Sequence, residues 1–125
     1  MIYGIGTDIV ESYRIEQSLN RYDDRFARRI LADSEWLEYH ASNKRVSFLA
    51  SRFAAKEALS KAMGTGLRHP VSLNYIIITH DELGKPFFFF FSELNKLIND
   101  KGITQHHLSI SDEVNMVCAF FVLEK

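Results

Sequence analysis

Residues 52–66 read RFAAKEALSKAMGTG, a run of small apolar and charged side chains that ends on Gly-Thr-Gly. The spacing predicts a long helix over residues 44–63, with Gly64 in the left-handed conformation that commonly follows a helix. Successive residues at about 100° intervals define one core-facing stripe. This stripe consists of Phe48, Ala55, Leu59, Ala62 and Met63. Glu57 falls nearly opposite, with Phe53 and Lys61 beside it.

The charges on the open side of this helix have two interpretations. Spacing alone favours an ordinary ion pair between Glu57 and Lys61, worth about 0.2–0.5 kcal/mol. Phe53, one turn before Glu57, indicates instead that this face is covered. The Gly-Thr-Gly sequence follows the helix at its negative end, whereas phosphate-binding loops precede a helix. A phosphate here would therefore be held by side chains such as Lys61.

Asp8 is a second notable carboxylate, at the end of a strand predicted over residues 2–10. Spacing alone favours a helix N-cap for the segment that starts at Glu11. Alternatively, Asp8 and Glu57 come from separate elements and form a Mg²⁺ site completed by phosphate oxygens and waters, since Mg²⁺ takes few protein ligands. An unpaired buried aspartate would be costly in either case.

The remaining pattern predicts an α+β fold in one domain over residues 1–125: a mostly antiparallel sheet with helices packed on one face. Strands are expected over 2–10, 73–80, 87–91, 106–111 and 115–124, and helices over 11–22, 25–31, 35–41, 44–63 and 92–101. Five consecutive phenylalanines, Phe87–Phe91, require an apolar neighbour on both faces of their strand. A second copy of the chain is the simplest neighbour for the outer face.

Composition excludes several classes of protein. The net charge of −1 argues against a broadly basic nucleic-acid binder, and no apolar stretch has the roughly 20 residues of a membrane span. Cys118, the single cysteine, lies in an apolar run and fits a reducing cytoplasmic setting. Five arginines gather at positions 14, 21, 25, 28 and 29. They form either a solvated helix surface or a docking patch for an acidic partner.

Several motifs occur together along the whole chain. They are IYGIGTDIVE at 2–11, RI at 14–15, RF at 25–26, RIL at 29–31, FLASRFAAKEALSKAMGTG at 48–66, GKP at 84–86 and HLSIS at 107–111. In this combination the chain resembles the holo-acyl-carrier-protein synthases, which are small phosphopantetheinyl transferases. The first motif and the long block carry most of the specificity. GKP alone would mean little.

The resemblance implies transfer of the 4′-phosphopantetheine arm of coenzyme A to a serine of apo-acyl carrier protein, a step of fatty acid biosynthesis that leaves adenosine 3′,5′-bisphosphate. It implies that Asp8 and Glu57 bind Mg²⁺ and that Lys61 contacts phosphate, these three being the catalytic set. Gly64 and His107 join Lys61 in binding coenzyme A. The docking surface for the carrier protein comprises Arg14, Arg21, Arg25, Phe26, Arg29 and Phe53. The family forms homotrimers with active sites between subunits.

One position departs from the commoner family pattern, because Asp112 follows Ser111 where many members have histidine. An acidic residue cannot supply the donor of a histidine, so Asp112 is given no phosphate-binding role. The group that deprotonates the acceptor serine stays open between Glu57 and a metal-bound water. The alternative function is a non-enzymatic adaptor that binds acidic proteins through the arginine-rich helices.

Overall fold

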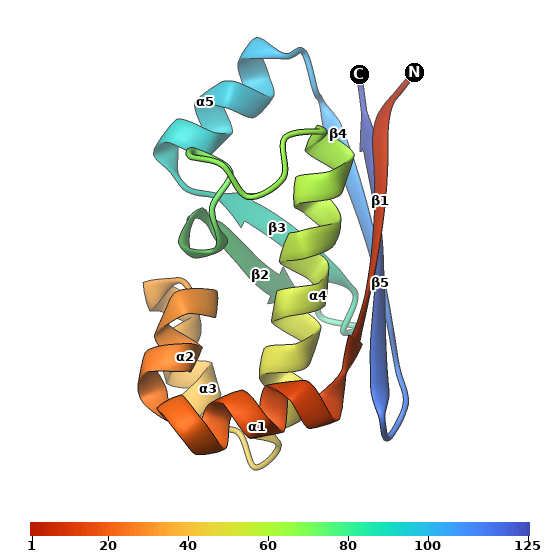
Figure 1. Cartoon of the computed structure of the whole chain (residues 1–125). Helices are drawn as coiled ribbons and strands as arrows, with labels where there is room; N and C mark the ends of the chain where they lie inside the picture. Colours follow the sequence, from red (N-terminus) through yellow and green to blue (C-terminus); the bar gives the residue numbers. More distant parts are fainter.

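A computed structural model describes all residues, 1–125, as helices packed against one side of an antiparallel sheet (Figure 1). The strands are β1 (Ile2–Glu11), β2 (Ile76–His80), β3 (Pro86–Phe90), β4 (Gln105–Asp112) and β5 (Met116–Glu124). The α-helices are α1 (Ser12–Tyr22), α2 (Asp24–Ile30), α3 (Trp36–Ala41), α4 (Arg45–Met63) and α5 (Ser92–Asp100). Two 3₁₀ turns, η1 (Asp33–Glu35) and η2 (Leu73–Tyr75), precede α3 and β2. None of the helices is both long and apolar enough to span a bilayer.

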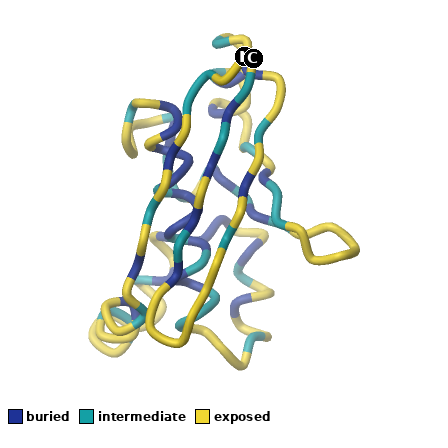
Figure 2. Tube along the Cα trace, turned by 90° about the vertical axis from the view of Figure 1, so that its right-hand side faces the viewer, coloured by how far each residue is buried: buried dark blue, intermediate teal, exposed yellow.

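The larger sheet has the strand order β1–β5–β4, with both pairs antiparallel. Thr7 of β1 lies opposite Phe120 of β5, which lies opposite Ser109 of β4. The first and last residues also meet, since the Lys125 N–H donates to the Met1 carbonyl at 2.7 Å. The two ends of the chain therefore lie side by side on neighbouring strands (Figure 2).

Helix α4 packs directly on β1 because β1 carries glycine where the two backbones meet. A Cβ atom added to Gly6 would lie 1.8 Å from the Ala58 carbonyl oxygen, and one added to Gly4 would lie 2.0 Å from the Ala62 carbonyl oxygen. No side chain fits in that space. Because side chains alternate along a strand, Asp8 shares the α4-facing side of β1 with these glycines.

The smaller sheet pairs β2 with β3, so the expected single sheet is divided in two. Strand β3 does not extend the edge of β4. Its rings pack against the inner face of the larger sheet instead: Phe88 lies 4.5 Å from Phe121, and Phe90 lies 5.3 Å from His106, between ring centroids. Aromatic packing between the layers thus replaces backbone pairing along the edge. On the other side of β3, Phe89 is more than half exposed.

The core-facing stripe predicted for α4 was too narrow. Ala55, Leu59, Ala62 and Met63 are buried as expected, and Phe48 is half-buried. A second face, containing Ala54 and Ala58, is fully buried as well. The helix is enclosed on two sides because β1 and β5 cover one flank and the helices α1, α2 and α3 contact it elsewhere. The C-terminal prediction is confirmed, since Gly64 has φ 78° in the left-handed region.

Candidate functional site

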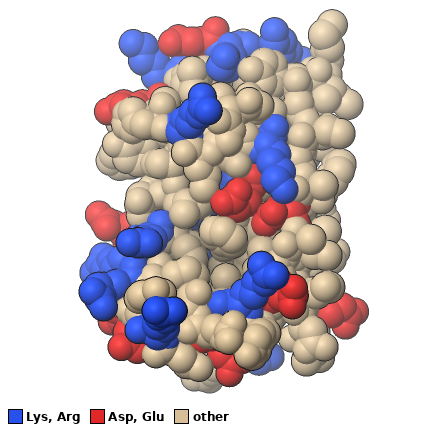
Figure 3. All heavy atoms as spheres, in the orientation of Figure 1, with Lys and Arg blue, Asp and Glu red and all other residues tan.

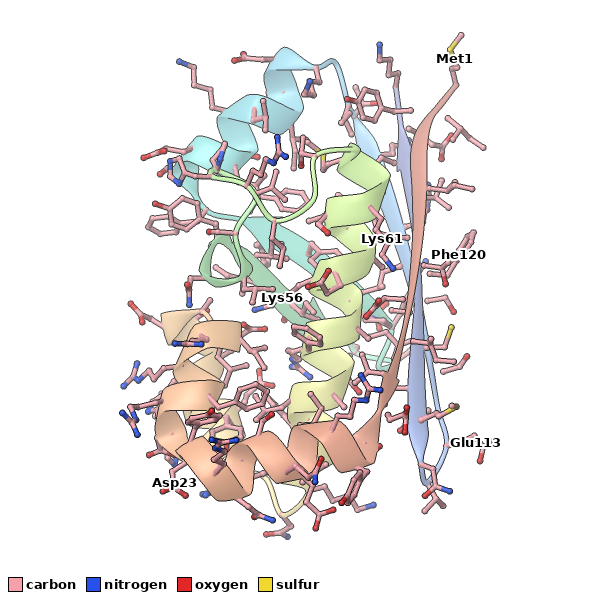
Figure 4. All side chains as sticks on the ribbon, viewed as in Figure 1. Met1, Asp23, Lys56, Lys61, Glu113 and Phe120 are labelled. Carbon is pink, nitrogen blue, oxygen red and sulfur yellow. The ribbon has the colours of Figure 1, made fainter.

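Asp8 and Lys61 meet where β1 crosses the last turn of α4. Lys61 donates from Nζ to Asp8 Oδ1 at 3.1 Å and to the Thr7 carbonyl oxygen at 2.9 Å. The Asp8 side chain is 16% exposed, whereas that of Lys61 is 52% exposed. In Figure 4, Lys61 lies between α4 and β1. The close helix–strand packing permitted by Gly4 and Gly6 therefore brings residues 53 positions apart into contact.

Glu57 completes this cluster from one turn earlier on α4. Burial raises the pKa of the Glu57 carboxyl, the charge of Asp8 raises it further, and Lys61 acts in the opposite direction. The Glu57 carboxylate itself makes no hydrogen bond or ion pair; only its backbone carbonyl accepts, from Ser60 Oγ. Two acidic groups thus share one partly buried site with a single basic partner.

Two interpretations that spacing alone favoured are wrong. Lys61 pairs with Asp8 rather than with Glu57 at i−4, because β1 lies within reach of its ammonium. Asp8 is not a helix cap, since it lies inside β1 opposite Ala119, and Glu11 precedes the first residue of α1. A salt bridge across elements and a carboxylate within a strand both depend on tertiary packing, which local spacing does not encode.

The donor set suits magnesium. The chain has no group of three or more His, Cys, Asp or Glu side chains that would enclose a metal. Asp8 and Glu57 supply two carboxylates, and Mg²⁺ is commonly held by one or two carboxylates together with substrate phosphates and waters. The carboxylates also carry more negative charge than Lys61 neutralises. These residues therefore fit a hard divalent cation that enters with a phosphate ligand.

Gly64 lies next to this cluster, at the end of α4. It lines a cavity of about 450 Å³ with Arg68 and His69, and none of Asp8, Glu57 and Lys61 lines that cavity. The other lining residues are Thr65, Pro70, Val71 and Leu97. The His69 ring is held by Glu93, with Nε2 and Oε2 at 2.6 Å.

His107 lies apart from this cluster. It lies on β4 opposite Val122 of β5 and so points to the outer face of the larger sheet, the face opposite Asp8. Its Nε2 lies 2.6 Å from Glu124 Oε1. The structure therefore does not bring His107 together with Asp8, Glu57 and Lys61 within one chain. Asp112 is exposed at the end of β4.

The arginines of the expected docking surface line two neighbouring hollows over α1 and α2. Arg14 and Arg21 line one, and Arg25, Phe26 and Arg29 line the other. Ser18 and Tyr22, which sequence reasoning did not select, line both. Ser18 lies between Arg14 and Arg21 on α1, and Tyr22 follows Arg21 at the end of that helix, so proximity to the arginines was the available signal. Figure 3 shows basic side chains over this part of the molecule.

Phe53 differs from the other members of the docking set. It is half-buried and packs against the hydrophobic core rather than lining either hollow. Arg28 was not in the set, and its guanidinium stacks over the Trp36 ring at 3.9 Å.

A buried ionic network beside α4 was not predicted. Lys56, fully buried, donates to Glu35 Oε1 and to the Ile30 and Leu73 carbonyl oxygens. Glu35 also accepts from the Ala32 and Ile78 backbone N–H groups. Burial lowers the pKa of Lys56 to about 8, against the opposing effect of Glu35. The helical wheel contained a signal, because Lys56 falls on the side of Leu49, Leu59 and Met63.

Comparisons with known proteins agree with the fold and the motifs. The family description "4′-phosphopantetheinyl transferase superfamily" matches residues 4–114. A holo-[acyl-carrier-protein] synthase of Nitrosospira multiformis is 63% identical over 125 residues, covering 100% of both chains. The crystal structure of the synthase from Neisseria meningitidis is 51% identical, with a TM-score of 0.97 and 100% of both chains covered.

A third relative was solved with a ligand. The synthase from Bacillus anthracis in complex with CoA (3′,5′-ADP) is 39% identical with a TM-score of 0.81, and the match covers 98% of this chain and 96% of that one. Full-length similarity, the matching fold and the family match lead to one conclusion: the chain belongs to the 4′-phosphopantetheinyl transferase superfamily.

Proposed function

We propose that this protein transfers the 4′-phosphopantetheine moiety of coenzyme A to a serine of apo-acyl carrier protein, as its relatives' names describe. The products are holo-acyl carrier protein and adenosine 3′,5′-bisphosphate, and the reaction takes place in the cytoplasm. The observation that carries this proposal is the convergence of Asp8, Glu57 and Lys61 where β1 crosses the last turns of α4. Two carboxylates and a lysine form the kind of site that phosphoryl transfer requires.

In this reaction the acceptor serine oxygen forms a bond to the phosphorus that carries pantetheine, and the bond from that phosphorus to the adenosine-bearing phosphate breaks. Asp8 and Glu57 would hold Mg²⁺, which neutralises charge on the diphosphate when bound. Lys61 lies at the exposed mouth of the site and contacts the leaving phosphate, where it stabilises the negative charge that develops. Gly64 leaves the end of α4 open for the cofactor.

The carrier protein docks on the arginine-lined hollows of α1 and α2. Four arginines in these hollows, Arg14, Arg21, Arg25 and Arg29, offer forked donors that suit the carboxylates of an acidic helix. Phe26 adds an apolar contact there. Phe53 supports the surface from α4 without lining it.

The protein acts as a homotrimer with active sites between subunits. The outer face of the larger sheet supports this, because its apolar side chains remain about half exposed. Ile5, Ile9, Met116 and Phe120 are 45–62% exposed on that face. In Figure 4, Phe120 points away from the helices. A shared site would also explain why His107 lies on the face opposite Asp8.

Mass spectrometry of an apo carrier protein tests the proposal. Incubation with the chain, coenzyme A and Mg²⁺ should add one phosphopantetheine to the acceptor, and Asp8→Ala or Glu57→Ala should abolish the addition. Full transfer by a folded double variant would overturn the metal assignment. An adaptor would bind the carrier equally well with or without coenzyme A and Mg²⁺, and no mass would be gained.

A further inference from the structure

The Lys61 ammonium lies against Asp8, a carboxylate that would also bind a metal ion. The ammonium donates to Oδ1 of Asp8, and Asp8 is one of the two carboxylates that suit Mg²⁺. The ammonium is therefore not free to bind phosphate alone. A second contact, to the Thr7 carbonyl oxygen, holds the ammonium against β1. An ammonium has three donors, so one remains free in this arrangement.

We propose that Lys61 is an exchangeable counter-ion for Asp8. It neutralises this carboxylate while the site holds no metal, and it transfers to the diphosphate of the incoming cofactor when a divalent cation takes Asp8. The inference rests on the proposed function and adds a step to it: the same lysine serves two anions in succession.

Charge and burial require such a counter-ion. The Asp8 side chain is only 16% exposed, and a charged carboxylate at that depth is costly without a partner. Glu57 increases the cost, because a second acid shares the site: burial raises the pKa of Glu57, and the charge of Asp8 raises it further. Lys61 is the only basic side chain that pairs with either acid. Removal of its charge would leave two carboxylates facing each other.

A divalent cation and the ammonium compete for the Asp8 carboxylate. A divalent ion bound to Asp8 Oδ1 would lie close to an ammonium that is 3.1 Å from that oxygen, and the two positive charges would repel. The exchange needs little movement, because the Lys61 side chain is half exposed and the Thr7 carbonyl can retain one donor. Rotation about the terminal bonds releases Asp8 while α4 and β1 stay in place.

This arrangement couples the two ligands. Without coenzyme A, Lys61 competes with the metal and weakens its binding. With coenzyme A, the diphosphate takes the ammonium, so the metal binds Asp8 without competition. Because coupling between two binding sites is reciprocal, the metal must strengthen coenzyme A binding by the same factor.

Titration of Mn²⁺, followed by the loss of the free-ion electron paramagnetic resonance signal, tests the exchange without any measurement of catalysis. Lys61→Met keeps the length of the side chain and removes its charge. We expect this variant to bind Mn²⁺ about two- to fivefold more tightly than the unmodified protein when coenzyme A is absent, the range expected for loss of one exposed ion pair. Lys96→Met, at an exposed position of α5, is the matched control and should change nothing.

A second titration, in the presence of coenzyme A, measures the coupling. Coenzyme A should strengthen Mn²⁺ binding in the unmodified protein, and by a smaller factor in Lys61→Met, which also binds coenzyme A less tightly. Circular dichroism establishes that the variant is folded, and Lys61→Gln provides a second neutral side chain if it is not.

The outcomes separate the inference from the proposed function. If the unmodified protein and Lys61→Met bind Mn²⁺ with equal affinity, and Asp8→Asn does not bind Mn²⁺, the counter-ion role is overturned. The assignment of the metal site then stands. Mn²⁺ binding that is unaffected by Asp8→Asn overturns the metal site itself, and the inference with it. Tighter binding in Lys61→Met alone supports the exchange.

Discussion

Two lysines of α4, five positions apart, have opposite environments. Lys56 is enclosed and makes three hydrogen bonds, whereas Lys61 is half exposed and makes two. Figure 4 shows them on different sides of the helix. The Lys56 ammonium joins the end of α2, η1 and η2, so its role is to fix the elements that carry the arginine-lined hollows. Loss of either Lys56 or Glu35 would leave an uncompensated charge in the core, so the pair holds these elements in one arrangement.

His106 provides a prediction about pH. Burial lowers the pKa of His106 from 6.5, and the neighbouring His107 lowers it further. The ring packs among Phe88, Phe90 and Phe121, and its buried Nδ1 has no hydrogen-bond partner. Because the folded pKa lies below the unfolded value, the unfolded chain binds the proton first. The contribution of neutral His106 to the free energy of unfolding is therefore complete above pH 6.5, and it is lost as the pH falls through the pKa of the folded state.

We expect the free energy of unfolding to fall more steeply between pH 7.5 and pH 5.5 in the unmodified protein than in His106→Gln, about the range over which a lowered histidine pKa acts. Urea unfolding followed by fluorescence measures both slopes. His80, whose pKa burial also lowers, is present in both proteins and cancels in the comparison. Parallel slopes would show that His106 is protonated equally in both states.

At the scale of elements, the contact between β1 and α4 positions the site. Gly6→Ala would place a methyl group within 1.8 Å of the Ala58 carbonyl oxygen, so α4 must move away from β1. We expect a loss of about 1–3 kcal/mol in the free energy of unfolding, typical of an overpacked core. Because Asp8 lies two residues further along β1, transferase activity should fall by more than stability alone explains.

Chemical denaturation and carrier-protein assays measure these two effects. Lys96→Ala, at an exposed position of α5 away from this contact, is the control. A Gly6→Ala variant with unchanged stability and activity would mean that α4 and β1 have room to separate without consequence.

Local sequence patterns were sufficient to predict most of the helices and strands and the left-handed conformation of Gly64. The helix that ends at Met63, the left-handed Gly64 and the β2–β3 hairpin follow from spacing and turn residues. The salt bridge of Lys61 could not be predicted in this way, because it depends on where β1 crosses α4. The burial of Lys56 could not be predicted from the helix alone, because its partner Glu35 lies 21 residues away in the sequence. The family resemblance, rather than spacing, brought Asp8 and Glu57 together.

At the scale of the whole molecule, the expected site residues lie on opposite faces of the larger sheet. Asp8 lies on the side of the sheet that faces α4 and Glu57, and His107 faces outward with Phe120 and Ile5. If neighbouring subunits complete each site, one copy contributes the carboxylates and another the histidine. Phe120 and its exposed neighbours would then form the contact between copies.

Mixing two inactive variants tests this arrangement. Asp8→Ala and His107→Ala should each lose most transferase activity. When the two are unfolded together and refolded as mixed trimers, about a quarter of the sites should contain both intact residues, because each comes from a different subunit. Activity should recover accordingly, whereas the two variants refolded separately and then combined should stay inactive.

No recovery in mixed trimers, with the trimer confirmed by light scattering, would place all site residues in one subunit. Recovery that matches the expected fraction would show that a single chain holds an incomplete site.

The pairing of β1 with β5 also has a consequence for synthesis. Strand β1 leaves the ribosome well before its partner β5, because Thr7 pairs with Phe120, which is more than a hundred residues later in the chain. Contacts this distant in sequence slow folding, and until they form the apolar edge of β1 is exposed to other chains. The nascent chain therefore depends on α4, which emerges midway and can cover the glycine face of β1 while the last strand is still being made.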